Sequence, residues 1–358
     1  MQQFKRYSTL FLLLVSSVLL AQNREKQIRK NFPLSSDGQV KIENKFGSVE
    51  FNTWEKNEIN IVVEMTVKNG SDERAAAFLN DIEIVFEHNP ESVSAITKLP
   101  SGSKQWFRNI FSFGKKNLNY AINYTIQLPK TAGVNVYNEF GDILIDTLQG
   151  QATIDCEFGN LEAEALLHKN NVVELEFSSK SFINQWNGGK IKAAFSDLVV
   201  EKAQAIELTA EHTKTTLGQI NSLIMDLEYG NLAVEQAVDS LQGKAEFLNA
   251  RIEKVTHHSN LRTEFGKLRI NEIGPKTKEF ILRTEFTGVR LGLHPAWAFV
   301  YDFTSSFTTI NSDIELNHSK TVIDNNLHHH EGIQKTAENV FTINAEFGNV
   351  KLFNSTKQ

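Results

Sequence analysis

An alternation of apolar and polar side chains with a period of two runs along most of the chain after residue 130. Ile154, Cys156 and Phe158 share one parity, and Leu161 and Ala163 resume the alternation after a Gly-Asn pair. A period of two is typical of strands that bury one face. Gly and Asn mark a tight corner because they accept a left-handed backbone conformation at little cost. Each such segment therefore predicts two short strands joined by a corner.

The same phrase recurs at a nearly constant interval, as EFGD at 139–142, EFGN at 157–160 and EFGK at 264–267. The spacing of the recurring aromatic is 18 to 21 residues, except for two gaps of 34 and 40 residues, where His212 and the region around Leu327 occupy the missing positions. We expect about twelve units. The aromatic positions are Phe140, Phe158, Phe177, Phe195, Tyr229, Phe247, Phe265, Phe286, Phe307 and Phe347.

A unit this short cannot bury its own apolar face, so it must stack on its neighbours. The sequence thus predicts an all-β fold, a parallel β-solenoid (β-helix) over residues 131–358, right-handed by the general preference of parallel crossovers. An antiparallel sandwich or barrel stays open as an alternative. Within the solenoid we expect the aromatics to form an internal stack. A polar ladder is expected two residues later, at Asp142, Asn160, Asp197, Asn231, Asn249 and Asn349.

The first 21 residues have the layout of a secretory signal peptide, with Lys5 and Arg6 before an apolar run from Leu10 to Leu20. We expect cleavage near Ala21 and an exported protein, periplasmic or at the cell surface. An uncleaved membrane anchor is the alternative, but the run is shorter than the ~20 apolar residues that span a bilayer. The single cysteine, Cys156, allows no internal disulfide and is expected to be a small buried residue.

Residues 22–130 read as a β-rich N-terminal module with one short helix. The segment SDERAAAFLNDI begins at Ser71 with a capping residue and has Glu73 in its first turn, which predicts the helix. The module is either a cap or an opening set of rungs with an insertion. An aromatic and basic insert at 101–117 interrupts its strands.

Together these features resemble the bacterial "putative adhesin" family of exported repeat β-solenoid proteins. The resemblance lies in GQVKIENKFGSVEFNTW at 38–54, IQLPKTAGVNVYNEFGDILI at 126–145 and the repeated FG(N/D)(I/L/V) phrases. It implies a surface or periplasmic β-solenoid with a role in envelope adhesion or envelope stress. It brings no catalytic residues to this chain.

Charge is unevenly distributed: residues 23–130 hold 15 Lys+Arg against 13 Asp+Glu, whereas residues 131–358 hold 20 against 30. Phosphate binding needs clustered basic residues, so nucleic acid is not an expected partner. Glutamates precede most of the recurring aromatics and would form an outward ladder if the units stack in register. In its early part we expect an acidic patch, Asp155, Glu157, Glu174 and Glu176, able to take a hard cation such as calcium; the alternative is a solvated acidic face.

Two further segments carry candidate chemistry. The insert could bind a partner, a glycan or a membrane surface through Trp106, Phe107, Arg108, Phe111, Phe113, Lys115 and Lys116, or it could fold back as a satellite core. The run His328, His329, His330 and Glu331 could ligate a metal by composition, although three consecutive histidines cannot all face one site on a strand. An acidic loop with a chance histidine run is the favoured reading of that segment.

No phosphate-binding glycine loop, GxSxG or HExxH phrase occurs, and no cofactor is expected. The sequence favours a non-enzymatic binding, adhesion or scaffold protein of the cell envelope, with an envelope protein or glycan as partner. A periplasmic envelope-stress or signalling accessory and a polysaccharide-acting β-helix enzyme are the alternatives.

Overall fold

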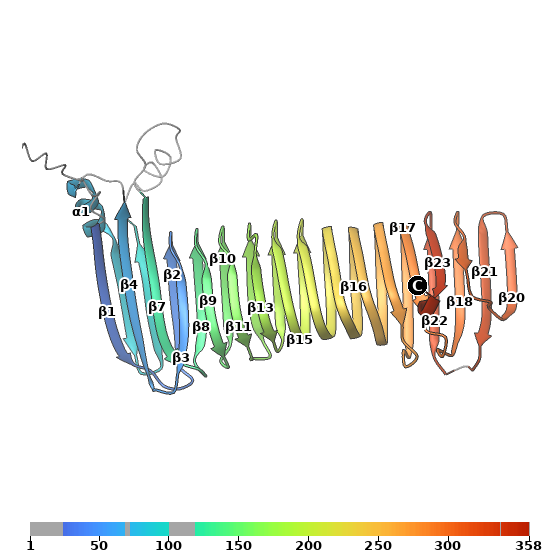
Figure 1. Cartoon of the computed structure of the whole chain (residues 1–358), viewed down its shortest axis with the longest axis horizontal. Coiled ribbons are helices and arrows are strands. Elements are labelled where there is room, and N and C mark those ends of the chain that lie inside the picture. The colour runs from blue at the N-terminus through green and yellow to red at the C-terminus, as the bar shows by residue number, and fades with distance from the viewer. Residues whose placement is uncertain (1–23, 69–71, 100–118, 337, 358) are drawn as a thin grey trace, which may run out of the picture.

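A computed structural model describes residues 24–68, 72–99, 119–336 and 338–357. Over these residues the chain is all-β: 23 strands join in one hydrogen-bonded sheet, and α1 (Asp72–Asp81) is the single α-helix among them. The strands follow one another along one long axis, with the N-terminal strands at one end and the C-terminal strands at the other (Figure 1). The predicted all-β class is confirmed.

The central repeats pair in parallel, each strand with the strand one repeat later. One series of strands precedes the aromatic corner: β8 (Gly133–Glu139), β10 (Ala152–Glu157), β12 (Asn171–Glu176) and β14 (Gly189–Ala194). The other series follows it: β9 (Ile143–Leu148), β11 (Leu161–Leu166) and β13 (Ser181–Trp186). Farther along, the ladder continues through the corners, so that β15 (Asp197–Glu211), β16 (Lys214–Ile273) and β17 (Glu279–Leu293) each span more than one side of the repeat.

The in-register pairing places like residues on top of one another in the core. One row of the first series consists of Val136, Ile154, Val173 and Ile191, and none of them is more than 1% exposed. Burying each such side chain contributes roughly 1.5–3 kcal/mol. Cys156 lies in the neighbouring row, fully buried, and burial raises the pKa of its thiol to about 12. The prediction of a small buried cysteine is therefore confirmed.

The stack of repeats begins before residue 131. β2 (Gln39–Lys45) and β3 (Val49–Trp54) pair in parallel with β8 and β9, and β6 (Ser92–Lys98) and β7 (Asn119–Pro129) pair in parallel with their other edges. Three antiparallel strands lie outside these: β4 (Glu58–Lys68) on β7, β1 (Arg24–Pro33) on β4, and β5 (Glu83–Asn89) on β6. The sequence leaves two alternatives open for residues 22–130, a cap or an opening set of rungs with an insertion. The observed pairing is the one expected for an opening set of rungs with an insertion. The predicted short helix is present as α1.

The C-terminal end departs from the consecutive order that the repeat predicts. β22 (Val340–Glu346) and β23 (Asn349–Asn354) lie between β17 on one side and β18 (Phe299–Ser306) with β19 (Ile310–Ser312) on the other (Figure 1). The last strands of the chain are thus inserted into the stack before its end. β21 (Leu327–Gln334) and β20 (His318–Asp324) form an antiparallel hairpin on the outer edge of β18.

This order corrects two expectations. The region around Leu327 does not supply a missing rung, because Leu327 lies in the hairpin opposite Ser306 and Asp324. The sheet as a whole is mixed, parallel through the repeats and antiparallel at both ends, and is not a simple parallel solenoid of consecutive rungs. The physical reason is that an end strand needs a hydrogen-bonding partner or a protected edge, which a hairpin supplies.

Two of the edge strands, β1 and β20, carry features that discourage pairing with another chain. β1 is rich in basic residues, including Lys26, Arg29 and Lys30, and ends at Pro33. β20 bears Lys320 and has an irregular register between His318 and Lys320. Charges, proline and bulges are common devices at sheet edges. Within the described ranges no helix is long and apolar enough to cross a membrane.

Replacing Phe341 by alanine should loosen the inserted strand β22. Phe341 is fully buried and contacts the rings of Phe280, Phe299 and Phe303. Its truncation is expected to destabilise the fold by about 3–5 kcal/mol, measured as a shift in the urea denaturation midpoint. The neighbouring Val340→Ala, at a position that is 41% exposed, is the control and should change stability far less. Equal effects of the two variants would show that β22 is not packed as described.

Candidate functional site

The recurring aromatics form an exposed edge along the molecule. Each adopts a left-handed backbone conformation, with φ between 46° at Phe347 and 64° at Phe46. From Phe158 onward, the exposed fractions of the large hydrophobic members run from 41% at Phe265 to 58% at Phe307, whereas Phe46 and Phe140 are half-buried. His212 has the same backbone conformation, so the prediction that it stands in for a missing aromatic is confirmed.

The rings stack face to face in one continuous column. Centroids of successive rings are 4.7–5.2 Å apart, and interplanar angles do not exceed 16°. Within the described residues the column runs Phe46, Phe140, Phe158, Phe177, Phe195, His212, Tyr229, Phe247, Phe265, Phe286, Phe347 and Phe307. Phe347 stands between Phe286 and Phe307, which matches the insertion of β22 and β23. We call this column the aromatic edge.

The expectation of an internal stack is therefore wrong. The two-residue alternation would bury Phe158 beside Cys156 if strand β10 continued through it. A left-handed residue reverses the side-chain direction, so the ring turns outward at the corner while Cys156 stays in the core. The ring faces cover one another, and only their edges and the outer end of the column meet solvent.

At Gly141 and Gly159, the glycine after the aromatic has a steric role and not the conformational one that the sequence indicated. Gly159 does not have a left-handed φ; a Cβ atom on it would lie 2.0 Å from the carbonyl oxygen of Gly141. Gly141 has the same relation to Gly47, at 2.1 Å. The glycines thus allow successive corners to approach closely, which holds the preceding rings at stacking distance. The expected polar ladder is present at least where Asp142 accepts two hydrogen bonds from Asn160.

A row of glutamates accompanies the aromatic edge, one residue before each of nine of its rings: Glu139, Glu157, Glu176, Glu211, Glu228, Glu246, Glu264, Glu285 and Glu346. We call it the glutamate row. Register places Glu157 directly beside Glu139 and Glu176, and Glu285 directly beside Glu264 and Glu346. Like charges directly opposite on parallel strands destabilise a sheet. Ion pairs compensate at two of its positions, where Lys45 lies 2.6 Å from Glu139 and Arg262 lies 2.7 Å from Glu264.

The predicted acidic patch is brought together by the same register. Asp155 is opposite Glu174 and Glu157 is opposite Glu176. Loss of solvent, followed by the charges of Glu174 and Glu176, raises the pKa of Asp155 above its ordinary value. The pKa of Glu157 is likewise raised, first by loss of solvent and then by its acidic neighbours. Lys192 forms an ion pair with Glu174 and closes one side of the patch. Calcium binding there stays a prediction.

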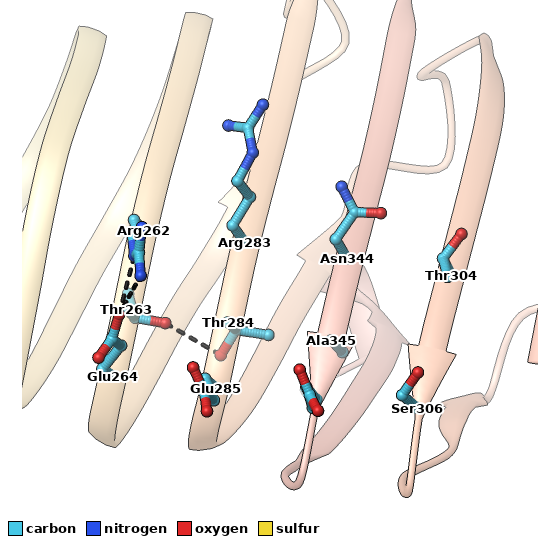
Figure 2. Close-up of a pocket in the computed structure, with 11 residues that line it drawn as sticks. Arg262, Thr263, Glu264, Arg283, Thr284, Glu285, Thr304, Ser306, Asn344 and Ala345 are labelled. Atoms are coloured by element: carbon cyan, nitrogen blue, oxygen red, sulfur yellow. Dashed lines mark hydrogen bonds and ion pairs between the residues drawn. The ribbon is translucent and has the colours of Figure 1, made fainter. Parts of the chain in front are cut away.

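A shallow depression of about 300 Å³ lies where the inserted strand interrupts the repeat (Figure 2). Arg262 and Arg283 stand in one row on β16 and β17, and the row continues with the shorter Asn344 and Thr304. Below them Glu264 and Glu285 point from the same strands (Figure 2). The depression arises because the side chains on β22 and β18 are shorter than the two arginines.

The other candidate residues fall in two places. The insert with Trp106, Phe107, Arg108, Phe111, Phe113, Lys115 and Lys116 lies outside the described residues, as does the predicted signal peptide. The histidine run lies on a strand and not in a loop, which corrects that interpretation: His328, His329, His330 and Glu331 all belong to β21. His329 and Glu331 approach Asp302 of β18, a contact that the sequence did not indicate because the partner is 27 residues away.

Removing one ring should reveal how much the column contributes to stability. Phe177 stacks on Phe158 at 4.8 Å and on Phe195 at 5.2 Å. Phe177→Ala loses both contacts and keeps the left-handed backbone, so a loss of about 1–3 kcal/mol is expected. Phe177→Asn should be less harmful because Asn tolerates this conformation. Denaturant unfolding measures the stability of both variants, with Val172→Ala at an exposed position as the control. If Phe177→Ala lost no more stability than Val172→Ala, the column would not be stabilising.

Neutralising Glu157 should stabilise the protein at neutral pH. A carboxyl whose pKa is raised on folding lowers stability fully at pH values above its folded pKa. The penalty decreases as the pH falls through that value and is gone below the pKa of the unfolded chain. Glu157→Gln is expected to gain about 0.5 kcal/mol at pH 7.5 and to equal the native chain near pH 4, measured by urea denaturation. Glu162→Gln, whose cross-strand neighbours are Leu144 and Phe182, is the matched control and should show no such difference. A loss of stability at pH 7.5 in the first variant would refute the interpretation.

Comparison with known proteins gives only weak likenesses. No family model matches the chain, and no curated protein matches it. A "putative cell adhesion protein" from Clostridium sporogenes is 9% identical, with a TM-score of 0.19, over 92% of this chain and 100% of its own. A "putative adhesin" from Bacteroides fragilis is 9% identical, with a TM-score of 0.28, over 91% and 97%. A "putative lipid binding protein" from Parabacteroides distasonis is 8% identical, with a TM-score of 0.29, over 91% and 96%. All three TM-scores lie well below 0.5, so these likenesses carry no argument about function.

Proposed function

We propose that this chain is an exported, non-enzymatic β-solenoid that binds a cell-envelope partner along the aromatic edge. The observation that carries the proposal is the exposed column of stacked rings, in which single members are 41–58% exposed. Soluble proteins rarely expose long contiguous apolar surfaces, and such surfaces mark interaction sites. A rigid repeat provides an extended face that needs no deep pocket.

The glutamate row favours a basic protein segment over a glycan as the partner. Sugars bind aromatic side chains through the ring face, and here each inner face is covered by a neighbouring ring about 5 Å away. Carboxylates beside an apolar edge complement a partner that carries both apolar and cationic side chains. Salt should weaken such binding because exposed charges are screened.

A pair of fluorescent peptides tests this proposal, one with alternating lysine and leucine and one with glutamate in place of lysine. The purified chain should bind the basic peptide and not the acidic one. The variant Glu157→Gln/Glu176→Gln/Glu228→Gln/Glu246→Gln should weaken binding at least about tenfold, whereas the equally charged control Glu162→Gln/Glu164→Gln/Glu201→Gln/Glu235→Gln should not. Fluorescence anisotropy measures the affinities.

If both variants weakened binding equally, the effect would come from net charge alone, and the proposal that the partner binds at the aromatic edge would be wrong. Binding by a neutral oligosaccharide panel in preference to the basic peptide would favour a glycan. A version lacking residues 105–116, tested beside the native chain, separates the contribution of the aromatic and basic insert from that of the edge.

The depression beside β22 favours one second candidate, an enzyme that acts on polysaccharides. Its lining combines Glu264, Glu285 and Glu346 with Arg262 and Arg283, and paired carboxylates are what glycoside cleavage uses. The carboxylates belong to a row that recurs in most repeats, and this makes a structural ladder the better account of them. Release of reducing ends from a polysaccharide by the native chain, and its loss in Glu285→Gln, would reverse this ranking.

A further inference from the structure

We propose that Asp302, His329 and Glu331 form a binding site for a divalent transition-metal ion, with zinc as the probe. This site is separate from the aromatic edge and does not depend on the proposed binding function. It lies at the C-terminal end, where strand β18 meets the hairpin strand β21 in antiparallel order.

Strand register brings the three ligands to one face. Asp302 is directly opposite Glu331, and His329 is two residues from Glu331 on the same strand, so all three side chains point the same way. His328 and His330 have the opposite parity. His330 faces His318 on the other side of the sheet, with ring centroids 5.1 Å apart. Only one histidine of the run can therefore take part.

The interatomic distances suit a shared ion. His329 Nε2 lies 3.0 Å from Asp302 Oδ1 and 3.3 Å from Glu331 Oε1. Two bonds of about 2.1 Å that meet at about 90–105° separate their ligand atoms by these distances. One ligand atom from each of the three side chains lies within 4.8 Å of the others. A tetrahedral ion with bonds of about 2.1 Å holds its ligand atoms about 3.4 Å apart, so the two carboxylates need to approach each other by about 1.4 Å at most.

Hydrogen bonds alone satisfy the three side chains of this cluster less well than a bound metal ion would. The Nε2 atom of a histidine carries at most one proton and faces two carboxylate oxygens at close range. An ion bound to the unprotonated nitrogen satisfies all three groups at once. The combination of one imidazole with two carboxylates suits Zn²⁺ or Mn²⁺. The His329 side chain is 26% exposed and that of Asp302 58%, which leaves coordination positions open to water.

Lys320 competes for the same position. Its Nζ lies 3.3 Å from Glu331 Oε1, so its ammonium partly neutralises the site that a metal ion would neutralise fully. Zinc binding must displace this ion pair, which limits affinity. Removing the ammonium should therefore strengthen binding, an effect opposite in sign to that of removing a ligand.

Titration of the full chain with zinc chloride, by calorimetry and by competition with a chromophoric chelator, tests the site. The native chain should bind one equivalent and show a higher melting temperature with zinc. His329→Ala and the nearly isosteric Asp302→Asn should each weaken binding about a hundredfold or abolish it. Lys320→Met should bind about tenfold more tightly. His328→Gln and His330→Gln, on the opposite face, are the matched controls and should bind like the native chain.

Three results would overturn the proposal. One is the absence of zinc binding by the native chain at millimolar concentration. Another is undiminished binding by both His329→Ala and Asp302→Asn. The last is equal loss in the two control variants, which would assign the binding to the histidine run without regard to its geometry. Asp302→Asn preserves side-chain size, so its melting temperature without zinc separates lost binding from lost folding.

Discussion

The structure depends on in-register parallel hydrogen bonding between successive repeats. Pairing Ile154 with Val136 on one side and Val173 on the other fixes every neighbouring position as well, because strands have a strict two-residue period. Core residues then form rows of mostly apolar side chains, corners form a column of rings, and the positions before the corners form a row of carboxylates. The apolar rows and the column of rings stabilise the fold, whereas the row of carboxylates destabilises it. The same strand register produces all three features. The acidic row is thus a by-product that the fold tolerates or that a partner uses.

The aromatic column explains how the chain sustains a strained corner in every repeat. A residue with a side chain costs roughly 1–2 kcal/mol in the left-handed region, and Phe158 and its equivalents all occupy it. A stacked aromatic pair contributes about 0.5–1.5 kcal/mol beyond its burial, which is of the same order. The column exists only if each corner approaches the next closely, and this is why glycine follows Phe140 and Phe158, where a Cβ atom would meet the preceding carbonyl.

The sequence predicts the repeat well because its signals are local. The period, the alternation within Ile154 to Ala163, the helix after Ser71 and the substitution of His212 for an aromatic all follow from residue spacing. The direction of the rings could not be predicted from the alternation, because a single left-handed residue reverses the side-chain direction. Phenylalanine is rarely found in this conformation, so the sequence did not indicate it. The insertion of β22 before β18 could not be predicted either. Both Phe307 and Phe347 fit the repeat, and strand order is decided by long-range packing around the fully buried Phe341.

The same constraint decides where a localised site can arise. Parallel in-register stacking aligns equivalent positions of successive repeats, so it produces rows of similar residues such as Glu139, Glu157 and Glu176. Such rows suit an extended partner. Different chemical groups also meet where strand direction changes, and β18 is such a place: it runs parallel to β22 and antiparallel to β21. There Asp302, from a repeat strand, is placed opposite a hairpin strand whose sequence is free of the repeat pattern, and an imidazole and two carboxylates converge as a consequence.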